Sequence, residues 1–196
     1  RGPSKVANNL KKGLENLGHT VNVNKIENNL VGCLQVVENM ELLPNTTVFG
    51  PNLFVLPSDF PKKIFEQRIK HLVCPSNWVK NIYQTFPQIT DNNVTVDVWS
   101  VGIETNLWIK SENKEKKFGI LYVKNRGERD VYLIKKLLEK SDAQYQIFEY
   151  GNYKEEELFE ACKKASFAVL LTSTESQGIA YMQILSCDIP CYVFNK

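Results

Sequence analysis

The sequence lacks the features that mark membrane-spanning and nucleic-acid-binding proteins. No apolar stretch approaches the roughly 18 residues that a membrane-spanning helix requires, and no basic-then-apolar signal segment opens the chain. Lys and Arg total 24 against 22 for Asp and Glu, and no long basic run occurs. Because nucleic-acid-binding domains carry a concentrated basic surface, these absences predict a soluble protein with no transmembrane segment and no nucleic-acid partner.

Cysteine is also used sparingly. The five cysteines are odd in number, and most lie inside apolar runs, as Cys74 does. This pattern suits small buried side chains in a reducing compartment. Cys187 and Cys191 have a spacing that metal sites use, but no second Cys or His pair lies nearby. We therefore expect a cytoplasmic protein without a bound metal.

The chain does contain enough apolar material for a folded core, since 43% of its 196 residues are hydrophobic. The clearest pattern lies in the second half, where short apolar runs alternate with amphipathic segments. The runs typical of buried strands are 118–123, 145–149, 167–171 and 191–194, and the segments with helical spacing are 129–140, 155–165 and 179–187. Strands that alternate with helices predict an α/β fold with a doubly wound parallel sheet.

The first half is similar but less regular. A helix is predicted over 4–17, ended by Gly18 as its C-terminal cap, and another over 77–86 with Ser76 as its N-cap. The other predicted elements are strands over 20–23, 31–37, 53–56, 71–74 and 94–101 and a helix over 61–70.

The polar, charge-rich run 110–117 separates the two halves and indicates a domain boundary. We place the domains at 1–107 and 108–196. Both ends look incomplete, because a Rossmann-like unit needs a strand before its first helix and the last strand has nothing to cover it.

The segment from Thr172 to Gly178 is the strongest candidate for a binding site. It joins the carboxyl end of a predicted strand to the start of a helix, which is where open parallel sheets bind ligands. Backbone N–H groups at Gly178 and Ile179 suit a phosphate, and the Glu175 carboxylate suits the hydroxyls of a sugar attached to it. Gln183, one helical turn further, can pair with more hydroxyls. An ordinary loop in which Glu175 only caps the helix is an equally open alternative.

Residues 175–190 resemble the Glu-x7-Glu signature of retaining GT-B glycosyltransferases, the glycosyltransferase family 4-like group. The likeness extends along nearly the whole chain in matching order. Segments 1–4 and 17–21 look like that family's amino-terminal glycine loop, with Gly2 and Pro3 in the loop, and its first helix. Segment 74–79 looks like its Pro-Ser element, and 101–105 like the Gly-Val-Asp-Thr turn before the domain crossover.

The resemblance implies a GT-B fold, in which two Rossmann-like domains face a cleft, the first on the acceptor side and the second for the donor. The implied reaction transfers a sugar from a nucleotide diphosphate sugar, with retention, to a glycan, lipid or protein acceptor. No cofactor is expected beyond this co-substrate, and the absence of an Asp-x-Asp motif agrees with the metal-independent binding that the resemblance implies. Peripheral membrane association is compatible with a lipid-linked acceptor.

The resemblance also implies roles for single residues. Glu175 takes the place of the acid that contacts the transferred sugar, and Gln183 replaces the second acid, which binds the ribose. Lys124 and Arg126 are our candidates for the diphosphate, because they follow a strand end and a guanidinium suits phosphate oxygens; a solvated basic loop is the alternative. The remaining donor-binding candidates are Tyr150 and Gly151, where a base could rest, and Ser176, Gln177, Gly178 and Ile179.

Two departures from the family pattern support a rival hypothesis. Gln183 keeps hydrogen-bonding capacity but has no charge. Family members often use a histidine in the first domain, whereas this chain has only His19 and His71 and none at 50–52. The rival is a catalytically weak or inactive GT-B-like scaffold subunit that binds a nucleotide or glycan. An unrelated doubly wound nucleotide-binding domain is a third alternative, which the lack of a Gly-x-Gly-x-x-Gly or Walker loop disfavours.

Overall fold

The computed structural model of the chain describes residues 2–23, 25, 31–32, 47–51, 56–59 and 69–194. The chain divides into two compact units, Arg1–Gly102 and Ile103–Lys196. This division lies before the boundary predicted between 107 and 108. The reason is that Ile103 packs against the core cluster of the second unit, in which Trp108 is buried.

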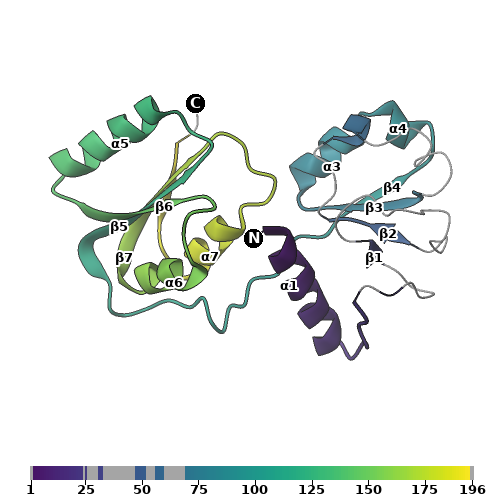
Figure 1. The fold of residues 1–196 in the computed structure, drawn as a ribbon, viewed down its shortest axis with the longest axis horizontal. Helices are drawn as coiled ribbons and strands as arrows, with labels where there is room; N and C mark the ends of the chain where they lie inside the picture. Colours follow the sequence, from purple (N-terminus) through teal and green to yellow (C-terminus); the bar gives the residue numbers. More distant parts are fainter. Residues whose placement is uncertain are drawn as a thin grey trace. The chain divides into compact units, whose positions relative to one another are not determined.

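The first unit contains a parallel sheet of four strands in the order β1-β2-β3-β4 (Figure 1). The strands are β1 (Val31–Gly32), β2 (Val48–Phe49), β3 (His71–Cys74) and β4 (Thr95–Val98), and the helices are α1 (Gly2–Asn16), η2 (Pro57–Asp59), α3 (Asn77–Tyr83) and α4 (Pro87–Thr90). Leu72 of β3 and Val96 of β4 pack with Val79 of α3 in its core. The sequence predicted β3 to the residue, and α3 begins directly after Ser76 as predicted.

The cap predicted at Gly18 is confirmed. Gly18 has a φ of +86°, in the left-handed region that glycine adopts without strain. Its N–H donates to the Glu15 carbonyl oxygen at 2.9 Å, and the His19 N–H donates to the Leu14 carbonyl oxygen at 3.1 Å. This paired arrangement satisfies two carbonyl groups at the end of α1 and stops the helix there.

Two predictions in the first unit are wrong. Gly2 and Pro3 form the start of α1 rather than a loop before it, because a proline in the first turn needs no N–H partner and has a helical φ. Residues 20–23 form no strand, since β-branched residues adopt one only where a neighbouring strand pairs with them. The strands predicted over 31–37 and 53–56 and the helix over 61–70 fall largely outside the described residues.

The second unit is a parallel sheet in the order β6-β5-β7-β8. The strands are β5 (Glu115–Lys124), β6 (Gln144–Glu149), β7 (Ala165–Thr172) and β8 (Cys191–Val193), and the helices are α5 (Glu128–Lys140), α6 (Glu155–Lys164) and α7 (Ile179–Ser186). All four strands and all three helices that the sequence predicted here are present, and the α/β class with parallel sheets is confirmed.

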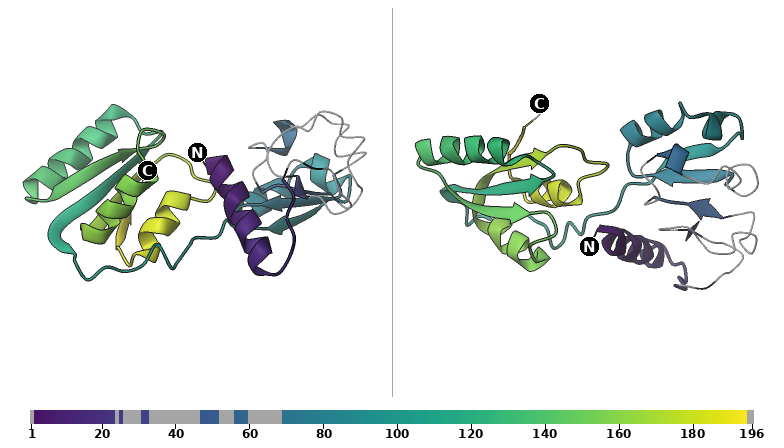
Figure 2. Two further views of the ribbon diagram at one scale, coloured as in Figure 1. Left: turned by 60° about the horizontal axis from the view of Figure 1, so that its bottom comes forward. Right: turned by 45° about the horizontal axis from the view of Figure 1, so that its top comes forward.

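The helices cover this sheet on both faces, α5 on one and α6 with α7 on the other (Figure 1, Figure 2). Ile120 and Leu170 are fully buried among Leu158 of α6 and Ile184 of α7. No residue of α5 is fully buried, although Leu121 of β5 and Leu171 of β7 are. The chain runs from β5 through α5 to one side and from β7 through α7 to the other, which makes the β5–β7 junction the topological switch point.

The cysteines that the structure describes are free thiols, and all but Cys191 are buried. None of the described helices combines the length and apolar character needed to cross a membrane. Within the same residues, no group of three or more His, Cys, Asp or Glu side chains is arranged to hold a metal ion.

Cys191, the first residue of β8, offers a chemical test of the packing in the second unit. Burial raises the pKa of its thiol from 9.0 to about 11, and only the thiolate reacts with iodoacetamide. We expect alkylation of Cys191 at pH 8 to be about 100-fold slower in the folded protein than in urea. Mass spectrometry of the peptide that contains Cys191 measures both rates, and equal rates would contradict this packing.

Candidate functional site

The switch point brings two loops of the second unit to one edge of the sheet. Lys124 ends β5, Thr172 ends β7, and these two residues are register partners in the parallel ladder. The loops that follow the two strands therefore leave the sheet side by side. This edge is where open parallel sheets bind ligands.

Lys124 and Glu175 meet at this edge in an ion pair. The Lys124 Nζ lies 2.7 Å from Glu175 Oε2, and the two side chains are only 17% and 20% exposed. The other carboxylate oxygen, Oε1, accepts hydrogen bonds from the backbone N–H groups of Ser176 at 3.1 Å and Gln177 at 3.5 Å. The structure thus joins four predicted site residues, and both oxygens of Glu175 are held in place.

Gly178 connects this loop to α7. It is the N-cap of α7 and has a left-handed φ of +74°. A Cβ at this position would lie 3.0 Å from a ring carbon of Tyr181 and 3.2 Å from Cγ of Glu175, so glycine lets the loop pack closely. The first turn of α7, which opens with Ile179, contains no acidic residue. No acid within the first turn therefore offsets the positive end of this helix dipole.

Arg126 was predicted to hold a phosphate, but the structure gives its guanidinium other partners. Nε donates to the Thr172 carbonyl oxygen and an Nη2 proton to the Phe194 carbonyl oxygen, both at 2.9 Å. Nη1 lies 3.5 Å from Asp130 Oδ2, and the arginine side chain is 11% exposed. Arg126 therefore ties the loop after β5 to the end of β7 and to the segment after β8.

Gln183 was predicted to contact ligand hydroxyls, yet it is turned toward α6. Its side chain is buried, with 3% exposure. Its amide Nε2 donates to Glu155 Oε1 at 2.8 Å. This residue joins α7 to the start of α6, and the structure does not bring it to Glu175.

The sequence did not single out three tyrosines that pack together at this edge, two of them near Glu175. The ring of Tyr122 lies edge-on to Tyr153 and Tyr181, with centroids 6.1 and 5.7 Å away. Burial raises the pKa of all three phenols, and the nearby Glu175 carboxylate raises the pKa further for Tyr122 and Tyr181. The hydroxyl of Tyr181 also bonds to Thr172. The sequence did contain a signal for them, because Tyr122 lies just before the carboxyl end of β5 and Tyr153 follows the carboxyl end of β6.

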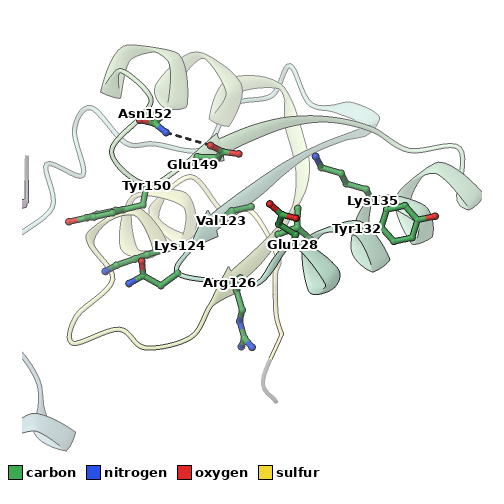
Figure 3. Close-up of a pocket in the computed structure, with 11 residues that line it drawn as sticks. Val123, Lys124, Arg126, Glu128, Tyr132, Lys135, Glu149, Tyr150 and Asn152 are labelled. Atoms are coloured by element: carbon green, nitrogen blue, oxygen red, sulfur yellow. Dashed lines mark hydrogen bonds between the residues drawn. The ribbon is translucent and has the colours of Figure 1, made fainter.

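Tyr150 and Gly151 form the turn after β6. Tyr150 is 53% exposed, and Lys124 Nζ lies 4.6 Å from the centroid of its ring. Gly151 has a φ of +87°. Tyr150 and Lys124 also line a hollow of about 470 Å³ between the end of β6 and the start of α5 (Figure 3). Figure 3 shows the Arg126 guanidinium pointing away from this hollow.

No protein-family model, curated protein or solved structure matches this chain.

The electrostatics of the edge favour an anion at one place and disfavour it at another. The first turn of α5 carries Glu128 and Asp130, which repel a phosphate. The first turn of α7 has no such residues, and Lys124 supplies a cation beside the loop that precedes it. At this edge the positive groups are thus Lys124, which is paired with Glu175, and the start of α7.

Proposed function

We propose that this chain is a retaining GT-B glycosyltransferase, which binds a nucleotide diphosphate sugar at the carboxyl edge of β5 and β7. The observation that supports the proposal best is the Lys124–Glu175 pair, a cation and a fixed carboxylate 2.7 Å apart at the switch point. A ligand with an anionic group next to a hydroxyl-rich group matches this pair. A nucleotide diphosphate sugar has both groups in adjacent positions.

In the proposed reaction, the acceptor hydroxyl oxygen forms a bond to the anomeric carbon while the bond from that carbon to the diphosphate oxygen breaks. The electron pair leaves with the diphosphate, which also takes the hydroxyl proton. Lys124 and the N-terminal end of α7 stabilise the negative charge that grows on the diphosphate. Glu175 accepts hydrogen bonds from the sugar and orients it for attack. The acceptor is a glycan, a lipid or a protein hydroxyl.

A binding subunit without turnover is the second candidate function. It is favoured by Arg126 and Gln183, whose polar groups bond to the protein itself rather than facing a ligand. In this candidate, the same edge holds a nucleotide or a glycan, but too few charged groups surround the diphosphate to drive its departure.

A panel of nucleotide sugars separates the two candidates. The protein is incubated with UDP-, GDP-, ADP- and CDP-linked sugars, and the release of free nucleotide is followed with and without mixed acceptors. Transfer or slow donor hydrolysis supports the glycosyltransferase. Nucleotide binding by calorimetry without release across the panel supports the binding subunit, and neither binding nor release contradicts both.

A further inference from the structure

The hollow beside α5 contains charged groups that the proposed transfer step does not use. Glu149 ends β6, Glu128 begins α5, and Lys135 lies about two turns further along α5; all three line the hollow. In Figure 3 their charged ends point into it. Within the described residues, the side chains of Glu128 and Lys135 have no hydrogen-bond or ion-pair partner, and the Glu149 carboxylate has only a 3.5 Å contact from the Asn152 side-chain amide.

This combination of groups selects for one kind of ligand. Two carboxylates disfavour a phosphate, and three charged side chains disfavour an apolar group. A vicinal diol fits, because each hydroxyl donates one hydrogen bond and also accepts. Its hydroxyls can donate to Glu149 while accepting from Lys135.

The position of Glu149 in the fold points to the diol of a ribose. In dinucleotide-binding Rossmann units, whose pyrophosphate lies at the first helix, an acidic residue about 20 positions after the first strand–helix turn binds the ribose hydroxyl. This chain shares the place of the acid but not that phosphate site, because Glu128 and Asp130 occupy the first turn of α5. Glu149 is the last residue of β6, which is the second strand of this unit and pairs directly with β5. Lys124 both lines the hollow and pairs with Glu175, so the hollow adjoins the edge where the phosphates are proposed to bind.

We propose that Glu149 binds the ribose 2′- and 3′-hydroxyls of the nucleotide and thereby makes the site selective for ribonucleotides. This inference rests on the proposed function, because it concerns the same ligand. It assigns the ribose to Glu149 in place of Gln183, whose amide is buried and bonded to Glu155. Glu149 is exposed at the mouth of the hollow, so its carboxylate is accessible to the ligand.

Calorimetry with paired nucleotides tests this assignment. UDP, GDP and ADP are titrated into the protein, and the tightest binder is compared with its 2′-deoxy form. Because a hydrogen bond to a charged group is strong, we expect the ribonucleotide to bind about 10-fold more tightly. Glu149→Ala should reduce that preference to less than about 3-fold, mainly by lowering the affinity for the ribonucleotide. Its affinity for the 2′-deoxy form should stay within about 2-fold of the wild-type value.

Three further variants make the result specific. Glu156→Ala removes an exposed acid from α6 outside the hollow and should keep the full preference. Glu149→Gln, which keeps the shape and one acceptor, should retain part of it. Gln183→Ala should leave the preference for the ribonucleotide intact. If Gln183→Ala lost this preference and Glu149→Ala kept it, the assignment to Glu149 would be overturned.

The outcomes also distinguish this inference from the proposed function. An unchanged preference in Glu149→Ala, or a wild-type protein that binds both nucleotide forms equally, overturns the ribose assignment and leaves the donor site in place. A wild-type protein that binds none of the nucleotides overturns the proposed function, and the ribose assignment falls with it.

Discussion

Replacing Glu175 with alanine is expected to lower sugar transfer by about 10²–10³-fold, the effect of removing one preorganised polar group from a reacting centre. Nucleoside diphosphate binding should be maintained or strengthened, because Lys124 loses the carboxylate that lies 2.7 Å from its ammonium group and can turn to the phosphates. Initial rates with a nucleotide sugar and calorimetry with the corresponding diphosphate measure the two effects separately.

Two companion variants give this prediction its specificity. Lys124→Met should weaken diphosphate binding as well as transfer, because it removes the cation rather than the sugar contact. Glu112→Ala, in the exposed linker before β5, removes an acid without a role at the site and should leave both quantities unchanged. A Glu175→Ala protein that transfers sugar at the wild-type rate would exclude Glu175 from the reaction.

The second unit could be predicted well because its two longest strands, β5 and β7, lie in the centre of a parallel sheet. Residues such as Ile120 and Leu170 are buried on both sides of the chain by strands and helices, and such positions require the continuous apolar runs that the sequence displays. The first unit gave weaker signals. Its strand β2 has only the two residues Val48 and Phe49, which is too short for any periodic pattern to indicate it.

The site was predictable in location but not in its contacts. Glu175 and Lys124 follow neighbouring strands, and topology alone places the ends of such strands together. Apart from Asp130, four residues from Arg126, the partners of Arg126 and Gln183 could not be read from spacing, because they come from distant parts of the chain. Phe194 lies 68 positions from Arg126, and Glu155 lies 28 positions from Gln183. A polar side chain at a strand end can face a ligand or bond to its own protein, and only packing decides between them.

Replacing Arg126 with methionine is therefore expected to destabilise the protein strongly. Arg126→Met removes the donors to the Thr172 and Phe194 carbonyl oxygens and leaves Asp130, whose side chain is 17% exposed, without its cation. Charged hydrogen bonds and largely buried ion pairs of this kind are costly to break, so we expect the free energy of unfolding to fall by about 2–4 kcal/mol. Urea denaturation measures the change.

Matched variants separate the bracing role of Arg126 from the phosphate-binding role that the sequence suggested. Arg129→Met, at an exposed position of α5, should change stability by less than about 0.5 kcal/mol. Arg126→Lys should recover only part of the loss, because an ammonium group lacks the planar fork that reaches two carbonyl oxygens at once. If Arg126→Met kept wild-type stability and bound nucleoside diphosphate at least 10-fold more weakly, the guanidinium would belong to the ligand. We expect the opposite pattern, since all three of its nitrogen atoms already face protein oxygens within 3.5 Å.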